Sequence, residues 1–226
     1  MAIIYNLYQC IAMNNQAIEH FEQGSFHRTL DILKQVLHSM TELMPRSPQA
    51  QEEPKETQAS FPPPNMLRRW SKRGFLQESG KDAVFVHCRA VFLVLPNSLD
   101  AHFYNIYATL ILYNIALCYH ALSLQETSGS GDAGPRHSFS NKAFSLYNMA
   151  FATMKESIYK DNVLITVLLN NSGHVLYLQG RAFEATKCLR RVHTLMFNLP
   201  MNSLEPDDFH GMYLNSLMVS NTASAA

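Results

Sequence analysis

The sequence has no excess of charge of either sign. Eighteen Lys and Arg residues are balanced by 18 Asp and Glu residues in a chain of 226 residues. A neutral chain has no general electrostatic attraction to nucleic acid or to an anionic membrane surface. Hydrophobic residues still make up 47% of the sequence, so a single packed domain over residues 1–226 is expected, and a disordered polypeptide is excluded.

Signatures of catalysis and of metal binding are also missing. The sequence contains no H-E-x-x-H, no G-x-S-x-G and no Walker loop, and no two histidines share a helix at ligand spacing. The letters G-x-G-x-x-G occur at residues 129–134, but they follow a predicted helix and precede Pro135, so they indicate a linker. We therefore expect no enzymatic activity, no cofactor and no small-molecule substrate. The alternative is an enzyme whose active-site residues are distant in sequence and come together only in the folded chain.

The four cysteines form no C-x-x-C pair, and each lies in an apolar run. This placement favours buried, reduced thiols. The apolar N-terminus lacks the basic residues of a signal peptide, so it is predicted to be the first helix. A reducing compartment, cytoplasmic or nuclear, is expected.

Residues 101–125 contain no Asp, Glu, Lys or Arg. A segment of this length without charge is a membrane span or a helix buried among other helices. Asn105, Asn114 and His120 would be costly in lipid, and no basic cluster flanks the segment. The sequence therefore predicts a central buried helix and no membrane association.

Apolar spacing predicts further helices on both sides of this central one. Their ranges are 2–23, 26–44, 139–159, 161–179, 181–197 and 206–220. Residues 83–95 are rich in Val and Phe and are predicted to form a strand. This strand pairs with residues 74–77 in a small β-hairpin, or with a strand of a partner. Residues 45–65, rich in Pro and Gln, and residues 127–137, rich in Gly and Ser, are expected to be flexible insertions.

Marker residues recur along the predicted helices. The first helix of each predicted hairpin contains a small residue: Ala17, Ala116 and Gly173. A turn residue follows seven positions later: Gly24, Ser123 and Gly180. Each second helix contains a small residue (Thr29, Ala143 and Ala185) and, four positions later, a large one (Leu33, Tyr147 and Leu189). The middle hairpin matches once about 15 residues are set aside as an insertion. Small residues at fixed places permit close helix–helix contact.

This pattern resembles the tetratricopeptide repeat. The resemblance covers roughly residues 10–44, 109–154 and 166–196, although the early Trp of the family is missing and Thr29 replaces an Ala. It implies an all-α stack of antiparallel helical hairpins with a capping helix at residues 206–220. It also implies a non-enzymatic scaffold that binds a peptide or helix of another protein on its concave face.

Three asparagines, Asn15, Asn114 and Asn171, lie two residues before the small markers of the first helices. In tetratricopeptide proteins, asparagine at this place lines the concave surface and binds the main chain of a peptide, so the resemblance implies a peptide-binding role. The amide suits this role because it offers a donor and an acceptor together. We expect the three side chains to face solvent on one common surface. The alternative is that they serve the structure of their own helices.

The most basic stretch, Arg68-Arg69-Trp70-Ser71-Lys72-Arg73, supports two other hypotheses. Residues 66–73 would be the contact of a nucleic-acid-associated protein, with Trp70 stacking on a base. Ser71 follows two arginines and is a candidate phosphorylation site. Without net positive charge behind it, a solvated surface patch is favoured over both.

Overall fold

A computed structural model describes residues 2–43, 67–74, 85–95, 101–125, 134–156, 161–200 and 203–222. These residues form seven helices and one two-stranded antiparallel sheet. In chain order they are α1 (Ala2–Glu22), α2 (Phe26–Leu43), β1 (Arg68–Gly74), β2 (Arg89–Leu93), α3 (Ala101–Gln125), α4 (Gly134–Glu156), α5 (Asn162–Leu178), α6 (Ala182–Met196) and α7 (Pro206–Thr222). The prediction of a mostly helical chain with a small β-hairpin is confirmed.

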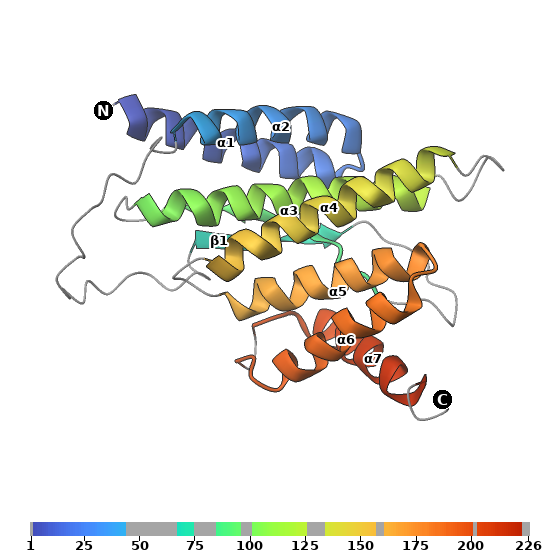
Figure 1. Cartoon of the computed structure of the whole chain (residues 1–226). Helices are drawn as coiled ribbons and strands as arrows, with labels where there is room; N and C mark the ends of the chain where they lie inside the picture. Colours follow the sequence, from blue (N-terminus) through green and yellow to red (C-terminus); the bar gives the residue numbers. More distant parts are fainter. Residues whose placement is uncertain are drawn as a thin grey trace.

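Each helix packs against the next helix in the chain, from α1 and α2 at one end of the molecule to α7 at the other (Figure 1). Helix α3 lies in the middle and contacts α2, α4 and β2. Its segment Phe103–Gln125 is long and apolar enough to cross a membrane, but the whole qualifying window is buried inside the protein. This burial agrees with the predicted central helix.

Local sequence explains the helix boundaries. Gly24 and Gly180 have φ values of 76° and 73°, a backbone conformation that glycine adopts without steric cost, and each separates the two helices of a hairpin. Asp161 caps α5 by accepting a hydrogen bond from the Leu164 amide at 3.1 Å. The side chain thereby satisfies one of the amides that a helix start leaves without an intrahelical partner.

Helices α2, α4 and α6 bury the same pattern of residues. Counted from the first small residue, buried positions follow at +4, +7 and +11: Thr29, Leu33, Val36 and Met40 in α2; Ala143, Tyr147, Ala150 and Met154 in α4; Ala185, Leu189, Val192 and Met196 in α6. The first two residues of each set are the predicted markers, and a methionine completes each set. Equal spacing in three helices means that each presents the same face to its neighbours.

Two predicted boundaries are wrong. Strand β2 pairs with β1, residues 68–74, so that of the predicted partner range 74–77 only Gly74 is described and paired, with Arg89. The most basic stretch of the chain is therefore a strand, because the backbone of β2 finds its partner further back in the sequence. Helix α4 begins at Gly134, so residues 134–137 of the expected flexible insertion are helical. The expected insertion 45–65 and the rest of 127–137 lie outside the described residues.

Candidate functional site

Four asparagines hold an extended segment of the chain itself. They are Asn15 on α1, Asn114 on α3, Asn171 on α5 and Asn215 on α7, and we call them the asparagine ladder. The segment comprises residues 85–93, which include β2, and we call it the resident segment. Each asparagine binds one residue of this segment through both its amide nitrogen and its carbonyl oxygen.

The geometry of the ladder is nearly constant from one helix to the next. Asn114 donates to the Val91 carbonyl at 2.8 Å and accepts from the Val91 amide at 2.8 Å. Asn171 makes the same pair of bonds to His87, both at 2.9 Å. These bonds satisfy both main-chain groups of the residue, as a neighbouring strand would.

The two ends of the ladder repeat this arrangement. Asn15 donates to the Leu93 carbonyl at 3.0 Å and accepts from the Leu93 amide at 2.8 Å. Asn215 makes both bonds to Phe85 at 2.7 Å. The resident segment therefore runs from α7 to α1, opposite to the order of the helices. The ladder binds only odd-numbered residues of the segment, because alternate residues of an extended chain point their main-chain groups to the same side.

Neighbouring side chains hold the ladder amides in place. Asn14 donates to the Val91 carbonyl and accepts from Asn114, both at 3.1 Å. At the other end, Asn170 donates to the Phe85 carbonyl at 3.1 Å and accepts from Asn215 at 2.7 Å. These bonds orient the ladder amides, so that each carbonyl oxygen faces an N–H of the segment.

Arg89 lies between the two halves of the ladder and is held by other groups. The Tyr113 hydroxyl donates to the Arg89 carbonyl at 2.8 Å. The Arg89 guanidinium donates to the Asp208 carboxylate at 2.6 Å, and to the Lys72 carbonyl of β1 at 3.0 Å. Arg89 thereby links β1, the resident segment and α7.

Beneath the segment lies a chain of buried aromatic groups. The His87 Nδ1 atom lies 3.1 Å from the Tyr113 hydroxyl. Because that hydroxyl donates its only proton to a carbonyl, His87 carries its proton on Nδ1 and leaves Nε2 as a bare acceptor, 3.7 Å from the Asp208 carboxylate. Burial, aided by Arg89 and Arg68, lowers the pKa of His87 to about 3. Tyr113 and His87 are fully buried and only the Asp208 side chain, at 7%, reaches the surface, so the imidazole itself is closed to a substrate.

A pair of buried histidines lies between α3 and α5. The His120 Nε2 atom lies 2.9 Å from the His174 Nδ1 atom, and the Tyr147 hydroxyl lies 3.2 Å from the other nitrogen of His120. Burial lowers the pKa of His174 to about 4, and burial together with His174 lowers the pKa of His120. Among the described residues no three His, Cys, Asp or Glu side chains gather in a way that could hold a metal ion.

The predicted site residues lie on one surface but do not face solvent. Asn114 and Asn171 have exposed fractions of 0%, and Asn15 is only partly exposed. The expectation of solvent-facing amides is therefore wrong, because the resident segment covers them. Asn215 was not among the predicted site residues, although it stands 44 residues after Asn171 at the corresponding place on the next inward-facing helix. No small residue follows it at the marker position, since Leu217 stands there.

The predicted solvated patch is correct only in part, because Arg68 and Ser71 are buried while Arg69 and Lys72 are exposed. Arg68 pairs with Asp161 through bonds of 2.8 and 3.1 Å and lies over the Trp70 ring. Arg69 lies over the Phe92 ring. Ser71 is 1% exposed, and its hydroxyl accepts from the Ala90 amide at 3.0 Å. A kinase reaches this hydroxyl only when β1 leaves β2.

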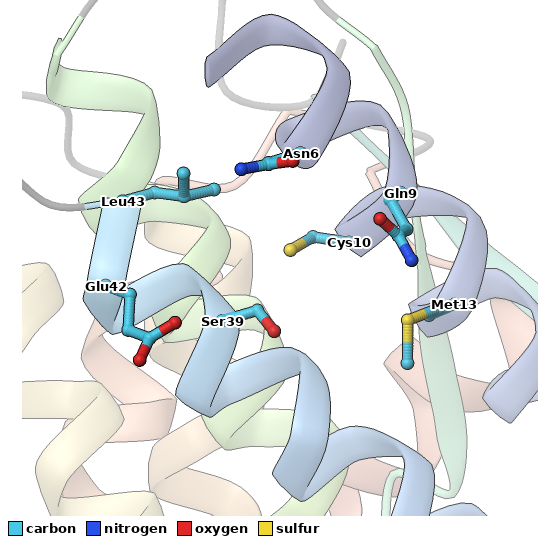
Figure 2. Close-up of a pocket in the computed structure, with 7 residues that line it drawn as sticks. All are labelled: Asn6, Gln9, Cys10, Met13, Ser39, Glu42 and Leu43. Carbon is cyan, nitrogen blue, oxygen red and sulfur yellow. The ribbon is translucent and has the colours of Figure 1, made fainter. Parts of the chain in front are cut away.

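A separate hollow of about 320 Å³ opens between α1 and α2. Asn6, Gln9, Cys10 and Met13 line it from α1, and Ser39, Glu42 and Leu43 line it from α2 (Figure 2). Burial raises the pKa of Cys10, so its thiol is protonated at neutral pH and a poor nucleophile. The hollow thus offers no activated group.

Comparisons with protein-family models, with curated proteins and with solved structures found no match to this chain.

Proposed function

We propose that this chain is a non-enzymatic protein-interaction scaffold, a tetratricopeptide-like stack of helical hairpins that binds an extended peptide on its inner face. One observation carries the proposal: the asparagine ladder binds both main-chain groups of alternate residues in an extended segment. The helices that carry the ladder are the first helices of successive hairpins, and α7 continues the series. The resemblance inferred from sequence implies asparagines at three of these four places.

The ladder recognises main-chain atoms, which every non-proline residue offers. Such a site tolerates many side-chain sequences, as strand-addition sites do. The resident segment occupies it as an intramolecular ligand, and its tether gives it a high effective concentration. A partner peptide therefore binds in exchange with the resident segment, and the partner is a protein with an extended, proline-free segment.

The exchange is testable in the full chain. Protease sites are inserted near residues 80 and 98, which leaves the resident segment held only by its contacts after cleavage. A fluorescent peptide of residues 83–97 is then added, and its incorporation is followed by gel filtration. We expect labelled peptide to replace the cleaved segment.

The matched control is the same peptide with Val91→Pro, which lacks the N–H that Asn114 accepts. It should enter far less. Equal entry of both peptides would show that the main chain is not what the site recognises. If neither peptide enters after complete cleavage, the groove is not a peptide-binding site.

The alternative, a nucleic-acid-associated protein that uses residues 66–73, has less support. Arg68 is buried in its pair with Asp161, which leaves fewer cations for phosphate groups. A salt-dependent mobility shift with RNA or DNA that Lys72→Ala weakens would favour this alternative.

A further inference from the structure

Strand β1 bulges at the point where it faces Arg89 of the resident segment. Its pairing register with β2 shifts between Trp70 and Gly74, and Gly74 pairs with Arg89. A bulge inserts extra residues into one strand and turns their main-chain groups out of the regular pairing. Here the carbonyls of Ser71 and Lys72 accept bonds from the Arg89 guanidinium at 3.3 and 3.0 Å. The bulge therefore presents two acceptors to one side chain.

Helix α7 supplies a third acceptor. The Asp208 carboxylate accepts from Arg89 Nε at 2.6 Å, while the two carbonyls of β1 share Nη1. The Asp208 side chain is 7% exposed and that of Arg89 is 23% exposed. Acceptors from two separate elements thus meet at one guanidinium. We call the Asp208 carboxylate and the Ser71 and Lys72 carbonyls the arginine site.

The carboxylate of the arginine site depends on Arg89 for its charge partner. Burial raises the pKa of Asp208, and Arg89 opposes that rise. The carboxylates of Glu205 and Asp207 raise this pKa further. Among the described residues, Arg89 is the only Lys or Arg that pairs with Asp208. The His87 ring lies 3.7 Å away, but burial lowers its pKa to about 3, so it is neutral at pH 7. A segment without a cation at this place would leave the carboxylate buried and unpaired, which is costly.

We propose that the groove occupied by the resident segment selects partner peptides by one arginine, which must stand at the place of Arg89. This inference rests on the proposed function and describes the partner that the site accepts. The ladder fixes the register: the arginine stands two residues after the residue that Asn171 holds, and two residues before the residue that Asn114 holds. The ladder binds any main chain, and the arginine site chooses among segments.

Lysine does not satisfy the arginine site equally well. The three acceptors bind two different nitrogens of the guanidinium, Nε and Nη1. A guanidinium is a rigid planar fork, whereas a lysine ammonium is a point charge on a flexible stem. Lysine would restore the charge opposite Asp208, but it must reach all three acceptors from one nitrogen atom. We therefore expect lysine to bind less tightly than arginine and more tightly than an uncharged residue.

The residues on either side of the arginine complete the description of the partner. The Phe85 ring packs against α7 at Gly211, and the side chains of Val91 and Leu93 are buried. Relative to Arg89, these three apolar residues stand four before, two after and four after. Their amides donate to ladder asparagines, which excludes proline at these positions. The partner is therefore a protein with an extended apolar segment that contains one arginine in this spacing.

The test uses the full chain with protease sites inserted near residues 80 and 98 and then cleaved, as in the exchange experiment. Two peptides of residues 83–97, one native and one with Arg89→Met, carry different fluorophores and are added in equal amounts. Gel filtration gives the ratio of the two labels on the protein. The native peptide should enter at least about tenfold more than Arg89→Met, with Arg89→Lys between them. A Val94→Thr peptide, changed at an exposed side chain, is the control and should enter like the native peptide.

Two variants of the chain identify the group that selects the arginine. Asp208→Asn keeps the shape of the carboxylate but removes its charge, so the native peptide should lose most of its advantage over Arg89→Met. Asp207→Asn, the same change at the exposed neighbouring residue, should keep the full ratio. An unchanged ratio in Asp208→Asn would overturn the proposal.

The comparison of peptides in the native chain does not depend on either variant folding. Equal entry of the native and Arg89→Met peptides, with the Val91→Pro peptide still excluded, would show that the groove binds main chain without selecting arginine. That result overturns the inference and leaves the proposed function intact. If no peptide enters after complete cleavage, the proposed function fails and the inference fails with it.

Discussion

Asn171 holds both main-chain groups of His87, 84 residues away in the sequence, through two bonds of 2.9 Å. The side chain of one helix residue thus makes the two main-chain hydrogen bonds that a neighbouring strand would otherwise make. Three other asparagines repeat the contact on three other helices. The inner surface of the molecule is therefore built around the backbone of a segment that belongs to none of the hairpins.

Asn171→Ala should destabilise the protein, although alanine is the better helix former. The change leaves a buried N–H and a buried carbonyl of His87 without partners, which costs about 2–5 kcal/mol. Urea unfolding measures this loss. Asn148→Ala, at an exposed position on α4, is the matched control and should change stability little. Equal stability of both variants would contradict the ladder.

Much of this arrangement could be predicted from the sequence, but one relation could not. The periodicity of small and apolar residues located the helices, and the repeated offset singled out three of the four ladder asparagines. These amides were expected to face solvent, whereas the resident segment covers them. Nothing local connects residues 85–93 to helices that lie before and after them, because that contact exists only once the helices have assembled.

Gly173 is a position of close helix contact. A Cβ there would lie 2.9 and 3.0 Å from two atoms of the Leu189 side chain. Gly173→Leu should therefore overpack the α5–α6 interface and cost about 1–3 kcal/mol in thermal or chemical unfolding. Shortening the opposing side chain with Leu189→Ala should recover part of that loss, so a purely additive double variant would argue against direct contact.

The Phe85 ring, at the first residue of the resident segment, packs directly against Gly211 of α7. A Cβ at this position would lie 2.3 Å from the Phe85 ring. Gly211→Ala should force the ring away and loosen the end of the segment held by Asn215. Amide exchange should then accelerate at Phe85 more than at Leu93, which lies at the opposite end. Unchanged exchange at Phe85 would mean that the ring does not pack on α7.

The three buried histidines should make the protein sensitive to acid. Burial depresses the pKa of His87 to about 3 and that of His174 to about 4, and it also lowers the pKa of His120. The unfolded chain takes up protons near pH 6.5 while the folded chain does not. Stability should therefore be constant well above pH 6.5 and fall as the pH drops towards 4, by up to about 1.4 kcal/mol per pH unit for each histidine.

Urea unfolding at pH 7.5 and pH 5.0 measures this slope. His174→Gln should reduce the difference in the free energy of unfolding between the two pH values by the contribution of one histidine. A free energy of unfolding that is equal at the two pH values would show that the histidines are not buried in their neutral form.

Residue-resolved amide exchange by NMR shows whether each ladder asparagine holds its own residue of the resident segment. In the native chain, the amides of Phe85, His87, Val91 and Leu93 should be strongly protected, since each donates to a ladder asparagine. Asn114→Ala should speed exchange most at Val91, and Asn171→Ala most at His87. If both variants instead accelerate the whole segment equally, or leave these amides unchanged, the asparagines do not hold the segment residue by residue and the account is contradicted.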